Sequence, residues 1–423
     1  MQSQTFENSN TTNKSGIGLK NNASQFGLLV LINLFVGGMV GLERTILPLI
    51  AKADFGIASK AAAISFIITF GITKASVNFF AGNFSDRWGR KRVLILGWLT
   101  GIPVPLIIMF APSWSWILFA NVLLGVNQAL TWSMTVVMKV DLADTNQRGF
   151  AIGMNEFAGY AGVALIAYLS GITASQYGLR PEPFLIGLVL AMSGLLLSLF
   201  TKDTRHHAHG PEQEKKAQIP LRTIFFKTSW GEKTLSASSL AGMVTNLKDG
   251  MLWGLLPIYL TTKDFSLEKI GIVVAVYPIV WSVSQLFFGP YSDRIGRKKL
   301  IVNGMTLQGI GVFSFVFFDS FAGTLTAAAL TGLGTAMVYP TLLALVSDIA
   351  DPEWRAAALG VYRFWRDSGY ALGALSGGLL ADALDIPLSI GIIAFTALLA
   401  SFITARRAQD KLQVTPLFQK KTS

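Results

Sequence analysis

The sequence predicts an all-α integral membrane protein with twelve transmembrane helices, arranged as two pseudo-symmetric six-helix bundles. Three observations predict it: the composition, the spacing of the apolar segments, and a motif repeated in both halves. Of the 423 residues, 52% are apolar or aromatic and only 14% are charged, whereas soluble domains carry about 25% charged residues. The mean hydropathy is +0.50. A soluble fold could not bury this much apolar surface, so we expect a polytopic membrane protein.

The apolar segments are long enough to cross a bilayer, which takes about 20 residues as a helix. Six precede the middle of the chain: 25–51, 60–82, 93–111, 114–138, 149–175 and 183–200. Six follow it: 235–262, 269–289, 300–318, 321–347, 355–381 and 387–405.

The polar segments divide the chain further. We interpret 1–24, rich in Asn, Ser and Thr, as a disordered N-terminus, and 406–423 as a tail. A central loop, 201–234, with one amphipathic segment separates the bundles 25–200 and 235–405.

The basic residues predict the orientation, because cytoplasmic loops retain Lys and Arg. With the N-terminus inside, 25 of the 35 Lys and Arg fall in cytoplasmic segments and only five in external loops. Both termini are therefore expected in the cytoplasm. The net charge of +11 follows from this topology, so we expect no nucleic-acid partner.

The sequence offers no sign of an enzyme. It contains no Cys, which excludes disulfides, thiolate metal sites and Cys nucleophiles. No phosphate-binding Gly loop or nucleophile motif is evident. His206, His207 and His209 lie in the central loop without carboxylate spacing that would complete a metal site. We expect no cofactor and no metal.

One motif occurs twice, 207 residues apart. GNFSDRWGRKR (82–92) aligns with GPYSDRIGRKK (289–299). The shared positions are Gly82, Asp86, Arg87, Gly89 and Arg90 in the first copy and Gly289, Asp293, Arg294, Gly296 and Arg297 in the second. The same offset places Asp141 on Asp348 in the next loop. A shared register in both halves fits two parallel repeats related by an axis along the membrane normal.

The pattern G-x-x-x-D-R-x-G-R-[KR], after the second helix of each half, resembles the major facilitator superfamily of secondary transporters. The resemblance covers nearly the whole chain: span count, central loop, topology and both loop motifs. It implies that these loops latch one half against the other on the cytoplasmic side. The alternative is that their basic residues only enforce topology.

The sequence departs from the drug–proton antiporters of this family at two places. They often carry an Arg in the fourth helix where this chain has Asn121, and Gly-Pro in the fifth where it has Gly159–Gly162. The subfamily therefore stays open.

Nine ionisable residues fall within the spans: Glu43, Arg44, Lys74, Glu156, Lys248, Asp249, Arg363, Arg366 and Asp367. Each would cost about 2.5–3.5 kcal/mol facing lipid at a helix centre, so we expect them to face the bundle interior. Neighbouring residues diverge by about 100° on a helix. At most one of each adjacent pair should then point into the cavity.

The charged residues allow two interpretations, proton coupling or structural pairing. Glu43 and Asp249, on the first helix of each half, are the candidates for proton carriers. Arg44 with Glu156, and Asp249 with Arg363 or Arg366, could instead form structural ion pairs. Lys74 is a cavity cation or a partner of Asp367. As substrate-cavity candidates we select Trp132, Trp253, Trp281 and Tyr339, although such aromatics also serve in packing.

These features predict a monomeric secondary transporter of the bacterial inner membrane, working by alternating access. Its partners would be a small-molecule substrate, protons and the lipid bilayer. Proton-coupled efflux of a small organic compound is the first interpretation. Proton-coupled uptake of an anionic metabolite or metal chelate is the second. A channel, and a non-transporting sensor or scaffold, are the alternatives from other classes.

Overall fold

The computed structural model describes residues 18–144, 147–205, 219–351 and 354–410. Within these ranges the chain is helical and has no strand. The expected disorder of the first residues, the His cluster and the end of the C-terminal tail lie outside the described residues.

Each predicted span corresponds to one helix or to two consecutive helices. In the first half these are α1 (Ala23–Ala53), α2 (Lys60–Ala63) with α3 (Ser65–Trp88), α4 (Arg90–Gly101) with α5 (Pro103–Phe110), α6 (Trp114–Leu142), α7 (Arg148–Tyr177) and α8 (Glu182–Leu199). In the second half they are α11 (Lys233–Thr261), α12 (Leu267–Ile295), α13 (Arg297–Phe317), α14 (Phe321–Ile349), α15 (Arg355–Ala383) and α16 (Ile386–Arg407). The amphipathic segment of the central loop is α10 (Leu221–Phe226) followed by the π-helix η3 (Lys227–Gly231).

Among the described residues, nine helices are long and apolar enough by themselves to cross a membrane. The remaining spans are α3, α11 and α15. All three carry charges within the span: Lys74 in α3, Asp249 in α11 and Asp367 in α15. They were nevertheless predicted as spans from the length of their apolar segments, and each forms a long helix.

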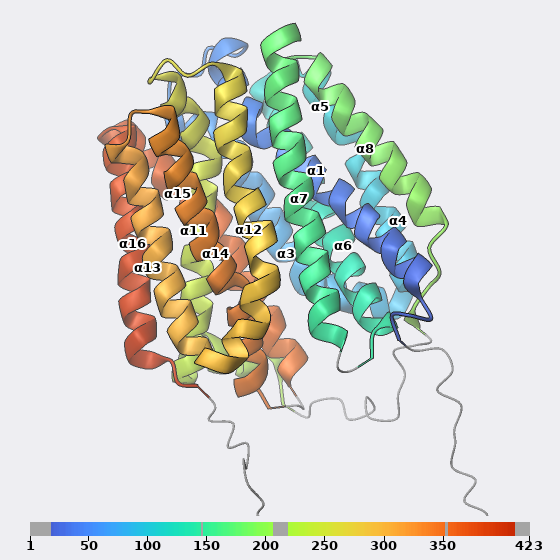
Figure 1. Cartoon of the computed structure of the whole chain (residues 1–423). Coiled ribbons are helices and arrows are strands. Elements are labelled where there is room, and N and C mark those ends of the chain that lie inside the picture. Colours follow the sequence, from blue (N-terminus) through green and yellow to red (C-terminus); the bar gives the residue numbers. More distant parts are fainter. Residues whose placement is uncertain (1–17, 145–146, 206–218, 352–353, 411–423) are drawn as a thin grey trace, which may run out of the picture.

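The helices form two groups side by side, α1–α8 and α11–α16 (Figure 1). The groups contact each other mainly where α7 packs on α12 and α3 packs on α15. Inside the groups, α1 packs on α7 and α11 packs on α15 in equivalent positions. The helices of these pairings therefore surround the centre of the molecule.

Glycines allow the two equivalent pairings to approach at backbone distance. A Cβ atom at Gly162 of α7 would lie 1.9 Å from the carbonyl oxygen of Leu34 in α1. A Cβ at Gly373 of α15 would lie 1.8 Å from the carbonyl oxygen of Leu247 in α11. Small residues at such crossings let helices pack tightly where lipid provides no hydrophobic driving force.

The two ends of the molecule differ in how the halves meet. We call the end that carries the loops 82–92 and 289–299 the motif end. At the opposite end, Asp382 of α15 accepts hydrogen bonds from the Ser59 hydroxyl (2.6 Å) and from the backbone N–H of Lys60 (2.6 Å) and Ala61 (3.0 Å). A Cβ at Gly171 would lie only 3.0 Å from the Cα of Gly271. The halves are therefore in close contact at the opposite end.

Candidate functional site

The nine ionisable side chains predicted within the spans lie on α1, α3, α7, α11 and α15. The aromatic candidates join them from α6, α11, α12 and α14. The site is thus assembled from both halves.

Glu43 is a buried carboxyl without a hydrogen-bonding partner. It lies on α1, is 1% exposed, and neither of its oxygens has a partner among the described groups. The side chain of Asn121 on α6 lies beside it, and that amide also donates one N–H to the carbonyl oxygen of Ile117 (3.1 Å). The residue that replaces the Arg of the drug–proton antiporters therefore leaves this carboxyl without a cation.

Arg44 and Lys74 rest on aromatic rings instead of carboxylates. The Arg44 guanidinium lies 4.9 Å from the Trp253 ring centroid. The Lys74 ammonium lies 5.3 Å from the ring of Tyr370, 5.5 Å from Phe70 and 5.6 Å from Trp132. Cation–π contacts hold a charge while leaving its hydrogen-bond donors available.

Lys248, Asp249 and Tyr277 form a closed cluster. The Lys248 ammonium lies 2.6 Å from Oδ1 of Asp249 and donates to the Tyr277 hydroxyl at 2.9 Å. Tyr277 in turn donates to the same carboxylate oxygen. All three side chains are buried. The acid on the first helix of the second half is therefore paired, whereas Glu43 is not.

A second buried pair connects the halves. Arg366 contacts Oδ1 of Asp367 through Nη2 at 2.7 Å and through Nε at 2.8 Å. The other carboxylate oxygen of Asp367 accepts from Asn78 of α3 at 2.7 Å. The Ser133 hydroxyl holds the Asn78 amide at 2.8 Å. This chain of hydrogen bonds runs from α6 through α3 to α15.

Glu156 lies in a third polar group, which contains a residue missed by the sequence analysis. One Glu156 oxygen accepts from the Trp132 indole at 2.9 Å and from Asn155 at 3.3 Å. Asn155 also accepts from the ammonium of Lys139 (2.6 Å), which is fully buried. Lys139 had been assigned to a loop because the span was ended at 138, but α6 continues to Leu142.

The interhelical ion pairs considered from the sequence are not those that the structure forms. Within the described part of the chain, the buried charge pairs are Lys248–Asp249 and Arg366–Asp367. The expectation that neighbours do not face each other was wrong here, because long Lys and Arg side chains bend back along the helix surface. Lys74 interacts with Asp367 only at long range.

The four aromatic candidates all reach the centre. Tyr160 stacks on Trp281 with a centroid distance of 3.5 Å and also contacts Trp132 (5.3 Å) and Tyr339 (6.0 Å). Trp253 lies on the other side of Lys74, against Phe70 and Tyr370. Tyr160 was not among the predicted cavity residues, although it lies in the sequence between Gly159 and Gly162, the glycines at which α7 packs on α1.

Small cavities remain between these side chains. One, of about 20 Å³, is lined by side chains that include Lys74, Glu156 and Arg363. A second of about 20 Å³ lies beside Arg44 and Asp249. Such volumes hold roughly one water each. In this arrangement the centre is nearly closed.

The motif loops have the same internal bonding in both halves. Arg90 bonds to Asp141 (2.9 Å) and to the Ser85 hydroxyl (2.9 Å). Arg297 bonds to Asp348 and to the Ser292 hydroxyl (3.1 Å). These bonds lie within one half and brace α4 on α6 and α13 on α14.

The glycines of the motif turn have a backbone that other residues rarely adopt. Gly89 has φ of 96° and Gly296 has φ of 93°, in the region that favours glycine. Arg87 and Arg294 are exposed. For Gly82, Asp86, Gly289 and Asp293 the structure describes only the helical backbone.

No group of three or more His, Asp or Glu that could hold a metal ion occurs in the part of the chain that the structure describes. What the site offers is a set of buried charges and aromatic rings between two helical halves. This is the arrangement of a membrane transporter with a central site.

Comparison with known proteins agrees with this class. The profile described as Major Facilitator Superfamily matches residues 29–268 and 238–421. The chain is 22% identical to the multidrug resistance protein MdtG of Citrobacter koseri, over 82% of this chain and 85% of that protein. It is 21% identical to a homolog of the multidrug efflux pump PmrA from Lactococcus lactis, over 90% and 94%.

The fold also matches solved structures. A crystal structure of a mutant of the nucleoside transporter NupG superposes with a TM-score of 0.76 at 13% identity, covering 91% of this chain and all of the other. The chain belongs to the Major Facilitator Superfamily. It is a multi-pass membrane transporter with the twelve-helix fold of that family, and not an enzyme.

Proposed function

We propose that this transporter is a proton-coupled exporter of small organic compounds that works by alternating access in a bacterial cytoplasmic membrane. The observation that carries the proposal is Glu43, a buried carboxyl on α1 whose oxygens have no partner among the described groups. An ionised carboxylate without a partner is very costly in apolar surroundings. Glu43 therefore holds a proton in this arrangement.

Release of the proton requires a change at Glu43. When the halves move, water or a cation such as Arg44, the next residue in the chain, gains access to the carboxyl. The free-energy cost of ionising Glu43 then falls. Asp249 already has Lys248 and Tyr277 as partners, so it serves structure or substrate instead. Proton coupling then depends on the first half of the molecule.

The same site supports a substrate class. Trp281, Tyr160 and Tyr339 provide aromatic faces, and planar ring compounds stack on such faces. The Nε atoms of Arg44 and Arg363 are buried without a hydrogen-bond partner among the described groups. A planar organic compound that carries an acidic group satisfies both features.

Export is the favoured direction because relatives along most of the chain are named as multidrug resistance and efflux proteins. Uptake of an anionic metabolite or metal chelate is the second candidate, favoured by the buried Nε atoms of Arg44 and Arg363, which have no hydrogen-bond partner among the described groups. A non-transporting sensor remains the alternative from another class.

We also propose that the motif end faces the cytoplasm, with both termini there, and that the bundles 25–200 and 235–405 move as units. The distribution of Lys and Arg supports this orientation. Because the chain has no Cys, a Cys introduced at Ser3 or Ser423 should react with an impermeant thiol reagent only after permeabilisation. Reaction in intact cells would contradict the orientation.

The latch role of the loops is likewise a proposal. Asp86 and Asp293 are the residues that would join the halves at the motif end when that end closes, since Arg90 and Arg297 are engaged within their own halves. The monomer is the proposed working unit, because the central site is complete within one chain.

Everted membrane vesicles test the proposed function. With an acidic interior, an antiporter accumulates a fluorescent ring-bearing organic acid inside as protons leave. A symporter accumulates it only with an alkaline interior. A sensor accumulates it with neither. Vesicles without the protein and a protonophore are the controls. We expect accumulation with the acidic interior alone, and either other result would overturn the proposal of proton-coupled export.

A further inference from the structure

A larger cavity lies away from the central site, at the motif end of the second half. It has a volume of about 260 Å³, and η3, α11, α15 and α16 contribute to it. Its lining comprises Ser229, Trp230, Ser236, Ala237, Ser239, Leu240, Met243, Trp365, Ile403 and Arg407. None of these residues belongs to the charge network described above.

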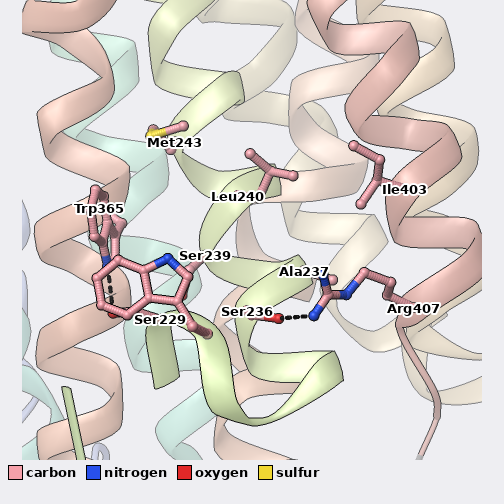
Figure 2. A pocket seen from close by; sticks show the side chains of 10 residues that line it. Ser229, Ser236, Ala237, Ser239, Leu240, Met243, Trp365, Ile403 and Arg407 are labelled. Atoms are coloured by element: carbon pink, nitrogen blue, oxygen red, sulfur yellow. Dashed lines mark hydrogen bonds between the residues drawn. The ribbon is translucent and has the colours of Figure 1, made fainter. Parts of the chain in front are cut away.

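The lining separates into an apolar and a polar part (Figure 2). Leu240, Met243 and Ile403 lie together on one side, one or more turns into α11 and α16. Arg407, the last residue of α16, lies at the other side and donates to the Ser236 hydroxyl at 3.1 Å. The apolar part therefore lies deeper in the membrane than the polar part.

The cationic end is not neutralised by a carboxylate. Among the ion pairs of the described residues, none includes Arg407, which donates instead to the neutral hydroxyl of Ser236. Arg407 is also exposed. It retains guanidinium donors for an anion from outside the chain.

Aromatic residues place this cavity at the membrane interface. Trp230 is 56% exposed and Phe226 is 62% exposed, on the short segment formed by α10 and η3. Trp230 packs edge-on against Trp365, with centroids 5.8 Å apart. Trp is enriched at the headgroup level of bilayers, and amphipathic segments of this kind lie in the interface plane.

We propose that this cavity is a binding site for an anionic phospholipid. The headgroup phosphate binds Arg407 beside Ser236, and part of an acyl chain occupies the space between Leu240, Met243 and Ile403. Charge complementarity and depth select this occupant, because basic pockets between transmembrane helices at the cytoplasmic surface bind anionic headgroups. The leaflet depends on the proposed orientation, but the chemistry of the site does not.

The site is connected to the centre through one helix. Trp365 lines the cavity, and its indole is held by the Ser229 hydroxyl at 2.8 Å. The next two residues of α15 are the buried pair Arg366 and Asp367. A lipid held against Trp365 therefore braces the helix that carries this pair.

Lipid titration of the full-length protein, purified in detergent and observed by native mass spectrometry, tests the site. The probes are dioleoyl-phosphatidylglycerol, dioleoyl-phosphatidylcholine with the same chains, and soluble glycerol phosphate. We expect the wild type to retain the anionic lipid most strongly. Arg407→Gln should weaken its apparent affinity about tenfold, as loss of a charge-assisted hydrogen bond does. Met243→Trp fills the apolar part of the cavity and should weaken the binding of both lipids.

Arg406→Gln is the matched control. Arg406 is the preceding residue, is exposed, and lies over the Phe402 ring (4.9 Å) outside the cavity. The proposal would be overturned if both Arg variants lost affinity for the anionic lipid equally, or if the wild type retained the two lipids equally. Binding of glycerol phosphate as strong as that of the anionic lipid would replace it with a soluble-anion site. An unchanged wild-type spectrum in all three titrations would likewise overturn the proposal.

Discussion

At the scale of single residues, the buried pair of Arg366 and Asp367 gives the clearest energetic prediction. Asp367 has no exposed surface, and Arg366 provides two of its contacts. Arg366→Gln leaves a buried carboxylate with Asn78 as its remaining neighbour. Breaking such a pair from one side costs about 3–5 kcal/mol. Thermal unfolding in detergent should show a clear drop in melting temperature.

The double variant distinguishes charge from packing. Arg366→Gln with Asp367→Asn removes both charges and should recover most of the lost thermal stability, because no unpaired charge remains. If the double variant is as unstable as the single one, Arg366 stabilises α15 through packing and not through Asp367.

Much of the residue-scale site could be predicted, and the rest depended on side-chain reach. Hydropathy placed Glu43 and Asp249 inside the spans, and both are buried. Asp249 is paired because the Lys248 side chain bends toward it, whereas Glu43 is not paired. Helical geometry alone does not predict this difference. Lys139 was missed because a polar residue at the end of an apolar run looks like the start of a loop.

At the scale of helices, the crossing of α1 and α7 predicts a strong response to one added methyl group. At Gly162 the nearest atom to an added Cβ is a backbone oxygen, 1.9 Å away. Since backbone cannot move aside cheaply, Gly162→Ala should destabilise the fold by about 1–3 kcal/mol. The measurement is again the melting temperature of the detergent-purified protein.

Gly153 provides the control in the same helix. Nothing lies within 4 Å of its added Cβ, so Gly153→Ala should be neutral or stabilising by up to about 1 kcal/mol. Equal effects of the two substitutions would mean that the methyl group acts through helix propensity and that the crossing is looser than described.

The contact of α2 with α15 at the opposite end predicts a pH-dependent closure. Burial alone would raise the pKa of Asp382, which lies just past the expected span 355–381. Hydrogen bonds from Ser59 and from the backbone N–H of Ala61 and Lys60 lower the pKa below its usual range. Because the pKa is lowered, the ionised carboxylate stabilises the closed contact at pH values above the ordinary carboxyl pKa of about 4. That stabilisation is lost as the pH falls through the pKa of the closed state.

Thiol labelling measures this closure in a chain without native Cys. With Cys at Leu256, a buried position of α11, Asp382→Asn should increase labelling several-fold at neutral pH. In the parent, labelling should increase only under acidic conditions. Asp385→Asn is the control, because Asp385 caps α16 through the N–H of Leu388 and does not join the halves. Identical labelling of the two variants would exclude a closing role for Asp382.

The helices themselves were largely predictable, and their packing was not. All twelve predicted spans correspond to helices within a few residues. Yet among the described residues α3, α11 and α15 are not among the nine helices that length and hydropathy identify, and α3 is apolar over the shorter stretch Ser65–Ala81. The cavity that Arg407 and Trp365 share has no signal in the sequence, since its lining comes from positions far apart in the chain.

At the scale of the whole molecule, the halves are alike in their motif loops and unlike at the centre. Arg90 and Arg297 have matching partners 207 residues apart. By the same offset, however, Glu156 corresponds to Arg363. Glu43 is unpaired, whereas Asp249 is held by Lys248 and Tyr277. This asymmetry is the reason for assigning the proton to the first half.

Substrate flux through Glu43→Gln in proteoliposomes tests this claim most directly. Gln imitates the protonated acid but cannot release a proton. The variant should therefore exchange labelled for unlabelled substrate without a gradient, and fail to accumulate it when a pH gradient is imposed. Glu156→Gln, at a buried acid with Trp132 and Asn155 as partners, should still accumulate substrate. If Glu43→Gln accumulates substrate like the wild type, with the same pH dependence, then Glu43 does not carry the coupling proton.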